Sequence, residues 1–428
     1  MKPIKVGLLG MGTVGTGVLR IVEGHQDDLQ KQIGSAIRIE KVLVKDKSKP
    51  RRYAVEQWRL TENAWDIIDD PEIDAVVEVM GGIEPAKSYI LAAIEKGKHV
   101  VTANKDLMAL HGTEILTKAA ERHCDVFYEA SVAGGIPIIR TLIDGFSSDR
   151  ITKIMGIVNG TTNYILSKMS LEGASYKDVL KEAQELGYAE ADPTSDVEGL
   201  DAARKMAILG TLGFRTSLSL DDIQVKGISQ VTKEDILYGK RLGYEVKLLG
   251  IAERQDDLIS VSVQPAMVKH THPLASVNGV FNAVYVYGEA VGETMFYGPG
   301  AGEMPTATSV VSDLIAVAKN LKLGVSGREV FIPYKEKKLK TDDQIASKFF
   351  IRLHVDDKAG VLAKITHVFA ECGVSLESVV QQPNSSIPDA EIVIITHDAS
   401  LASMKRVLNE FEQLEVIREI KSVFRVEG

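Results

Sequence analysis

The sequence predicts an α/β protein that begins with a doubly wound parallel sheet. Up to about residue 130, short apolar runs alternate with helix-like segments, a pattern typical of a buried parallel sheet with helices on both faces. A glycine-rich turn joins the first apolar run to the first helix-like segment. The chain has 428 residues, which is more than one hydrophobic core usually contains, so we expect roughly two to four domains.

The order of the predicted elements divides the chain into four segments. Residues 1–130 carry the parallel-sheet pattern, and residues 131–334 are expected to form an α+β domain with a mixed sheet. The polar residues 335–344 are predicted to be a linker, and residues 345–428 follow the order βαββαβ, which predicts a ferredoxin-like fold. In the second segment we expect strands in ITKIMGIVNGTTNYILSKM, KLLGIAER, LISVSVQPAMV and AVYVYGEAVGETMFYG, and helices at 175–187, 196–210 and about 306–321.

The composition argues against several classes of partner. The net charge of −9 disfavours a nucleic acid or an anionic membrane surface. No stretch of about 18 apolar residues is present, so we expect no membrane span. The two cysteines, Cys124 and Cys372, have no metal-ligand spacing and fit a reducing compartment. These features predict a cytoplasmic protein.

The glycine-rich turn reads GMGTVG (10–15) and lies between a predicted strand and a predicted helix. In this setting one glycine allows a tight turn, one lets the backbone approach a pyrophosphate, and one allows close packing of helix against strand. The amides at the helix N-terminus favour a phosphate. We therefore expect residues 1–130 to form a Rossmann domain that binds a dinucleotide; a tight turn without a ligand is the alternative. The residues expected at the dinucleotide are Gly10, Gly12, Thr13, Val14 and Gly15.

The choice of cofactor depends on the end of the second predicted strand. A carboxylate there suits the ribose 2′-hydroxyl of NAD(H), whereas a cation suits the 2′-phosphate of NADP(H). Here Val44 and Lys45 precede Asp46, and Arg51 and Arg52 lie close by in the sequence. This pattern favours NADP(H) over NAD(H), with a solvated basic loop as the alternative.

The stretch LGYAEADPTSDVEGLDAARKMAI (186–208) gathers five carboxylates and then a lysine. We expect a helix from Asp196 to Gly210 with Ser195 or Asp196 as N-cap. Within it, Asp201 and Lys205 stand four residues apart, a spacing that also suits an ordinary surface ion pair. The density of acids in the preceding loop favours a pocket for an ammonium-bearing ligand, because a desolvated cation needs an opposite charge.

Two long motifs, NGTTNYILSKM (159–169) and LGYAEADPTSDVEGLDAARKMAIL (186–209), resemble the homoserine dehydrogenase family, and the resemblance extends from Ile4 to the C-terminus. It implies reversible, NAD(P)-dependent interconversion of L-homoserine and L-aspartate 4-semialdehyde, in the biosynthesis of threonine, methionine and isoleucine. The implied substrate is an amino acid, which agrees with the ammonium-bearing ligand expected from the acidic stretch.

The resemblance also implies roles for individual residues. Lys205 matches the family's proton-transferring lysine, and Lys105 matches its second active-site lysine, which also lies near the cofactor. Substrate contacts are implied for Glu190 and Asp201, with Asp196 in support, and backbone contacts near the cofactor for Gly187 and Gly302. A site for a monovalent cation, Na⁺ or K⁺, is implied at Glu129, Val132, Gly134 and Ile136, mostly through backbone carbonyls. In the implied oxidation, neutral Lys205 takes the hydroxyl proton of homoserine while hydride leaves the same carbon for the nicotinamide.

The C-terminal segment opens with DKAGVL (357–362), which resembles the strand–loop–helix opening of an ACT domain. The implied effector is threonine, and a purely structural or dimerising module is the alternative. The resemblance implies a homodimer or homotetramer. Two further functions stay open at this point. An aspartate-semialdehyde dehydrogenase would need a nucleophilic cysteine beside a base, and a non-catalytic NAD(P)-binding amino-acid sensor would need neither Lys105 nor Lys205.

Overall fold

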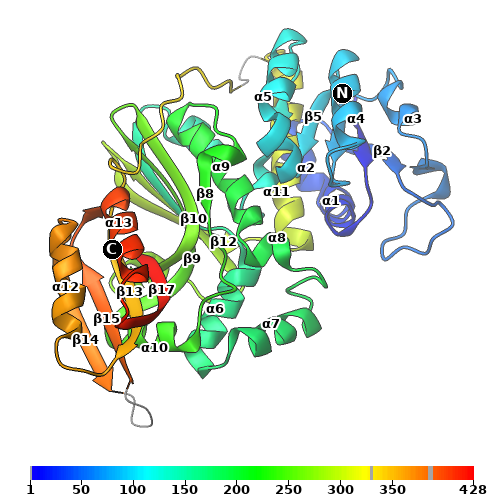
Figure 1. Ribbon diagram of the computed structural model, residues 1–428. Helices are drawn as coiled ribbons and strands as arrows, with labels where there is room; N and C mark the ends of the chain where they lie inside the picture. The colour runs from blue at the N-terminus through cyan, green and yellow to red at the C-terminus, as the bar shows by residue number, and fades with distance from the viewer. Residues whose placement is uncertain (1, 328–330, 384–388) are drawn as a thin grey trace. The chain divides into compact units, whose positions relative to one another are not determined.

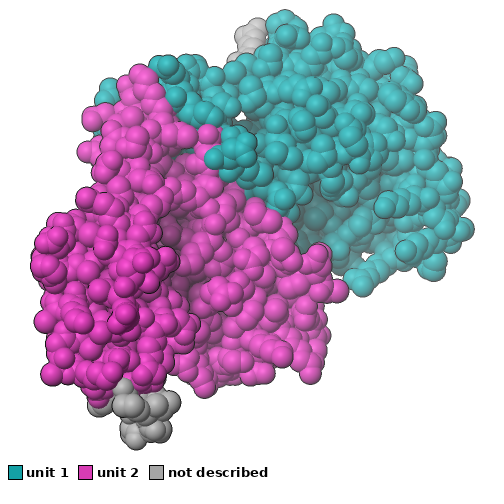
Figure 2. Space-filling model, viewed as in Figure 1, with its two compact units in different colours: residues 1–154, 204–221, 282–337 teal, residues 155–203, 222–281, 338–428 magenta. Residues whose placement is uncertain are grey.

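The computed structural model describes residues 2–327, 331–383 and 389–428 (Figure 1). The chain forms two compact units, coloured separately in Figure 2. Unit 1 comprises residues 1–154, 204–221 and 282–337, and unit 2 comprises residues 155–203, 222–281 and 338–428. Each unit is built from segments that are distant in the sequence.

Unit 1 contains the predicted parallel sheet. Its six strands run in the order β3-β2-β1-β4-β5-β6, and every pairing is parallel. The doubly wound prediction is therefore confirmed, with the carboxyl ends of the central strands at one edge. The strands are β1 (Ile4–Leu9), β2 (Ile37–Leu43), β3 (Leu60–Thr61), β4 (Ala75–Glu78), β5 (His99–Thr102) and β6 (Val126–Phe127). Its helices from the first segment are α1 (Thr13–Gly24), α2 (Gln26–Ile33), α3 (Trp65–Ile68), α4 (Ala86–Glu95) and α5 (Lys105–Glu121).

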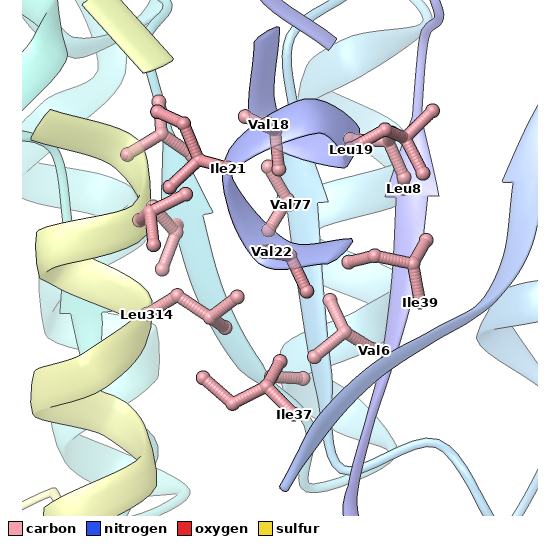
Figure 3. Close-up of a cluster of buried hydrophobic side chains, with 14 of the residues drawn as sticks. Val6, Leu8, Val18, Leu19, Ile21, Val22, Ile37, Ile39, Val77 and Leu314 are labelled. Carbon is pink, nitrogen blue, oxygen red and sulfur yellow. The ribbon is translucent and has the colours of Figure 1, made fainter. Parts of the chain in front are cut away.

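A helix from much later in the chain completes the core of this sheet. The helix α11 (Glu303–Leu323) places Leu314 in the same buried cluster as Val6 of β1 and Val22 of α1 (Figure 3). The two helices approach closely, because a Cβ on Gly17 of α1 would lie 2.8 Å from Cβ of Ala307. The division at residues 130 and 334 stays a prediction, although α11 packs on the core of the first segment.

The run 151–169, predicted as one strand, is a strand followed by a helix. The strand β7 (Ile151–Ile157) ends before Asn159, which caps α6 (Gly160–Glu172) by accepting a hydrogen bond from the amide of Thr162. The prediction was wrong because a short apolar run does not by itself distinguish a strand from a buried helix. Similarly, AVYVYGEAVGETMFYG forms two strands, β11 (Phe281–Gly288) and β12 (Gly292–Pro299).

The predicted helix 196–210 is interrupted at Gly199. The structure has α8 (Thr194–Val197), whose N-cap is Pro193, and then α9 (Leu200–Phe214). Gly199 takes a left-handed φ of +81°, and a Cβ there would press on the side chains of Val263 and Val225. Only glycine adopts this conformation readily, so the break corrects both the helix start and the predicted N-cap.

Unit 2 contains an antiparallel pair, β9 (Tyr244–Gln255) and β10 (Leu258–Lys269), and the C-terminal module. The module has the predicted order: β13 (Ala346–Asp356), α12 (Val361–Glu371), β14 (Leu376–Pro383), β15 (Asp389–Thr396), α13 (Leu401–Glu412) and β17 (Ile417–Glu427). Its sheet order is β17-β13-β15-β14, which confirms the ferredoxin-like prediction. Unit 2 also contains α7 (Tyr176–Glu185), β8 (Ile223–Val225), α10 (Lys233–Arg241) and β16 (Ala399–Ser400).

The C-terminal module is joined to the rest of unit 2 by backbone and side-chain contacts. Residues Ala266–Val268 of β10 pair in parallel with Arg425–Glu427 of β17. Arg352 on β13 donates to the carboxylate of Asp235 on α10 at 2.7 Å, and both side chains are fully buried. The module therefore continues the sheet of unit 2, and it is not suspended on a free linker.

Candidate active site

A cleft of about 930 Å³ lies at the carboxyl ends of the central strands of unit 1. Gly10, Gly12 and Thr13 line it. Gly10 has a φ of +108°, which makes the tight turn, and a Cβ on Gly12 would meet no atom within 4 Å. A Cβ on Gly15 would lie 2.2 Å from the carbonyl oxygen of Gly10. The loop thus has the turn, the open backbone and the close packing that a dinucleotide site needs, and the cleft is large enough for a dinucleotide.

The predicted cofactor-selecting residues line the same cleft. Val44 and Lys45 contribute to its wall. The carboxylate of Asp46 accepts hydrogen bonds from the hydroxyl and the amide of Ser48, and these bonds hold the pKa of Asp46 below its usual value. Asp46 is therefore engaged in its own turn, while basic side chains surround it. The basic residues on the wall of the cleft are Lys45, Lys49, Arg51 and Arg52.

Both predicted catalytic lysines belong to unit 1. Lys105 begins α5 directly after β5, and Asn104 caps this helix by accepting from the amide of Leu107. Lys205 lies in α9. The residue after Lys105 and the residue before Lys205 form an ion pair, with 3.0 Å between Nε of Arg204 and Oδ1 of Asp106. This contact brings the first turn of α5 next to α9.

The acidic stretch belongs to unit 2, except for the part of α9 that begins at Arg204. Asp196 and Asp201 come together there, because the side-chain amide of Asn159 donates to both carboxylates, at 2.7 Å and 2.9 Å. Asp201 is only 6% exposed. Glu190, by contrast, is exposed in the loop after α7 and takes no part in these two hydrogen bonds.

Two other residues of the stretch have local roles in the structure. Gly187 follows α7 with a φ of +77°, and the carbonyl of Tyr188 accepts from the hydroxyl of Thr161 at 2.6 Å. This bond ties the first turn of α6 to the acidic loop. Sequence reasoning missed Asn159, although it opens the motif NGTTN, because residues 151–169 were predicted as one strand. A helix predicted from Gly160 would have identified Asn159 as its N-cap.

The predicted cation loop is buried in unit 1. The carboxylate of Glu129 accepts from the amides of Ile139 and Arg140, at 2.7 Å and 2.8 Å, and burial raises the pKa of this carboxyl. Both oxygens of Glu129 thus hold the loop, while main-chain carbonyls are the main ligands implied for a cation. Neutral oxygen ligands of this kind suit Na⁺ or K⁺. Val132, Gly134 and Ile136 are also buried.

Gly134 and Gly302 are two predicted site residues whose backbone has a defined role. The carbonyl of Gly134 already accepts from the hydroxyl of Ser309 at 2.7 Å, and a carbonyl oxygen has a second lone pair for a cation. Gly302 is the N-cap of α11 with a φ of +124°, next to Glu303, which lines the dinucleotide cleft. Among the described residues, no three His, Cys, Asp or Glu side chains form a group that could hold a metal ion.

The cysteine required by the first alternative function is not activated. Cys124 is 1% exposed, and burial raises the pKa of its thiol to about 11. A nucleophilic cysteine needs a lowered pKa or an adjacent base, so Cys124 does not serve an aspartate-semialdehyde dehydrogenase.

Among the described residues, none of the helices has the length and apolar character of a membrane span.

Comparison with known proteins gives matches along nearly the whole chain. The model for "Homoserine dehydrogenase, NAD binding domain" matches residues 10–129, that for "Homoserine dehydrogenase" matches residues 137–315, and that for the ACT domain matches residues 349–416. Homoserine dehydrogenase from Bacillus subtilis is 58% identical over 100% of this chain and 99% of its own length.

Solved structures agree with these matches. A homoserine dehydrogenase from Thiobacillus denitrificans has a TM-score of 0.95 and 40% identity, covering 100% of this chain and 99% of that chain. A hyperthermophilic archaeal homoserine dehydrogenase in complex with NADPH has a TM-score of 0.63 and 26% identity, covering 75% of this chain and 98% of that chain. The chain therefore belongs to the homoserine dehydrogenase family of NAD(P)-dependent oxidoreductases, with a nucleotide-binding, a catalytic and an ACT domain.

Proposed function

We propose that Lys205 and Lys105 act together on the reacting oxygen of homoserine or aspartate semialdehyde. The observation that carries this proposal is the ion pair between Asp106 and Arg204, which lies next to each lysine in the sequence. In the oxidation, Nζ of Lys205 accepts the hydroxyl proton as the C–O bond becomes a carbonyl, and in the reduction it returns that proton. Lys105 orients the same oxygen by donating a hydrogen bond. The nicotinamide cofactor, when bound, accepts or supplies the hydride.

The acidic residues would hold the amino-acid end of the substrate. Asp196 and Asp201 offer two carboxylates within reach of one nitrogen atom, an arrangement that suits an ammonium group. Glu190, which is exposed, would add a third contact once substrate is present. Gly187 and Gly302 would contribute backbone groups near the cofactor.

Replacement of Lys205 by alanine tests the proton-transfer role. The Lys205→Ala variant should lose about 10²-fold or more in kcat for homoserine oxidation, the usual scale for a lost general base, with little change in KM for the cofactor. Lys181→Ala is the matched control, because Lys181 lies on the surface of α7 with 78% of its side chain exposed. A Lys205→Ala variant that keeps the wild-type kcat would reject the assignment.

NADP(H) is the cofactor that the cleft favours over NAD(H). Support comes from the basic side chains of Lys45, Arg51 and Arg52 on its wall, and from the relative that is in complex with NADPH. The ratio of kcat/KM for NADP⁺ and NAD⁺ measures this preference directly, and a ratio below one would contradict it.

The loop at Glu129, Val132, Gly134 and Ile136 would hold Na⁺ or K⁺, mostly through backbone carbonyls. Because such an ion would bind a loop of unit 1 that packs on α11, its role would be to order the chain, and not to touch substrate. Raising NaCl or KCl should increase the melting temperature more than an equal concentration of tetramethylammonium chloride. Equal effects of all three salts would contradict the proposal.

The C-terminal module would bind L-threonine at the loop Asp357–Gly360 and act in a cytoplasmic homodimer or homotetramer. The boundaries at residues 130, 334 and 344 are part of this proposal. Deletion of the module is not a clean test, because it would remove Arg352 from the buried Asp235 and the partner strand from β10. Inhibition of the intact enzyme by L-threonine but not by D-threonine is expected, and the absence of inhibition would contradict the effector role.

A further inference from the structure

Asn159 lies between Asp196 and Asp201, the two carboxylates proposed to bind the substrate ammonium. Its Nδ2 lies 2.7 Å from Oδ1 of Asp196 and 2.9 Å from Oδ2 of Asp201. Both N–H groups of one amide are therefore directed at two different carboxylates. Asn159 is 5% exposed and Asp201 is 6% exposed, so these bonds form largely away from bulk water, where a hydrogen bond to a charged group is strong.

The other end of the same side chain has a separate task. Oδ1 of Asn159 accepts from the amide of Thr162 at 2.9 Å and so caps α6. The two tasks use different atoms: the oxygen stabilises the helix, and the nitrogen holds the carboxylates. Aspartate caps helices as well as asparagine does, but an ionised aspartate has no hydrogen to donate. An exchange at this position can therefore separate the two tasks.

We propose that Asn159 is a positioning residue, whose neutral amide holds Asp196 and Asp201 together as a binding site for the substrate ammonium. This inference rests on the proposed function of those two carboxylates. Like charges that are close together repel one another, so loss of the shared donor would favour separation of the two carboxylates. The amide opposes this separation by donating to both groups, and it adds no positive charge of its own that would compete with the ammonium.

The test compares Asn159→Asp with Asn159→Ala. Asn159→Asp keeps the helix cap but replaces the bridging donor with a third carboxylate. At about pH 9, we expect KM for homoserine to rise about tenfold or more, the scale of one lost hydrogen bond to a charged group, while KM for NADP⁺ stays unchanged. As the pH falls towards about 6, the introduced carboxyl, which two carboxylates flank, binds a proton and donates again, so KM should return towards the wild-type value. The charged residues next to the pair in the chain, Glu198, Arg204 and Lys205, are the same in every variant, and the wild type measured at each pH accounts for their titration. Asn159→Ala should raise KM at every pH, because it cannot recover a donor.

The matched control is Asn163→Ala, one turn further along α6. Asn163 is 1% exposed, and its amide donates to the backbone carbonyl of Phe281 at 3.1 Å, not to a carboxylate. Its replacement should lower the melting temperature while leaving the pH profile of KM as in the wild type. Any structural effect of a lost buried amide is thereby measured separately.

The outcomes also separate this inference from the function on which it rests. If Asp196→Asn and Asp201→Asn raise KM for homoserine but Asn159→Asp keeps the wild-type KM at every pH, the positioning role is wrong. If neither aspartate variant changes KM for homoserine, the proposed ammonium-binding site itself is wrong. A pH-dependent rise in KM for Asn159→Asp, absent in Asn163→Ala, would support both.

Discussion

Two buried aspartates of unit 2 are held by different kinds of donor. Asp235 accepts from the guanidinium of Arg352 at 2.7 Å, whereas Asp201 accepts from the neutral amide of Asn159 at 2.9 Å. The guanidinium supplies both hydrogen bonds and an opposite charge. The amide supplies hydrogen bonds alone. The guanidinium joins Asp235 to the C-terminal module, whereas the amide joins Asp201 to Asp196 and, as we propose, orients both for the substrate ammonium.

The contacts of Asp235 hold two parts of unit 2 together. Arg352 also donates to Glu391 and to the hydroxyl of Thr232, and Thr232 forms a capping box with Asp235 at the start of α10. The network joins α10 to β13 of the C-terminal module inside unit 2. Its members are fixed by one another, as a buried ion pair requires.

The largest expected effect on stability comes from breaking this buried pair. Arg352→Met leaves Asp235 buried without its cation, which should lower the free energy of unfolding by about 3–5 kcal/mol. Urea denaturation measures the loss. The double variant Asp235→Asn/Arg352→Met should recover most of it, because asparagine still caps α10. A loss below about 1 kcal/mol in Arg352→Met would show that the network does not join the two parts of unit 2.

The second prediction concerns the other aspartate and is smaller in free energy. Asp201→Asn removes the charge proposed to hold the substrate, so kcat/KM for homoserine should fall by roughly 10- to 100-fold, equivalent to about 1.5–3 kcal/mol. Asp192→Asn is the matched control, because Asp192 is exposed and bonds only to Thr194 in its own turn. If Asp201→Asn and Asp192→Asn have equal kinetics, Asp201 has no role in substrate binding, and the contrast between Asp201 and Asp235 fails.

Lys247 on β9 allows the comparison to be repeated with a buried cation. Its Nζ donates to two neutral oxygens, the carbonyl of Val277 and Oδ1 of Asn278, and burial lowers its pKa to about 8. Between pH 8 and the ordinary value of 10.5, the unfolded chain binds more protons at this site than the folded chain. Wild-type stability should therefore rise relative to Lys247→Met by about 1.4 kcal/mol per pH unit in this window. Parallel stability curves for the two proteins across this range would show that Lys247 keeps an ordinary pKa in the fold.

Local patterns predicted a large part of this fold. The alternation of strands and helices in residues 1–130, the glycine loop and the order of elements in residues 345–428 all depend on short-range signals, and the structure has each of them. The break at Gly199 was missed because it depends on contacts with Val225 and Val263 on other strands. The packing of α11 on β1 and α1 likewise depends on residues that are far apart in sequence.

For the site residues too, local patterns were predicted and long-range contacts were not. The glycine loop and Lys45 were predicted from their position after strands, and the cleft is lined by Lys45 and by Gly10, Gly12 and Thr13 of that loop. Asn159 could not be assigned to the acidic stretch, because nothing in NGTTN indicates which carboxylates its amide meets 37 and 42 residues later. Glu190 was grouped with Asp196 and Asp201 through the family resemblance, and its side chain is exposed whereas Asp201 is buried.

The central claim is that Lys105 and Lys205 meet at one reacting oxygen. A crystal structure of the enzyme with homoserine and an oxidised cofactor tests it most directly, through the distances from each Nζ to the hydroxyl oxygen of homoserine. We predict that both distances fall within hydrogen-bond reach, about 2.6–3.2 Å. Two lysines that face separate cavities, or a homoserine hydroxyl that contacts neither of them, would contradict the account.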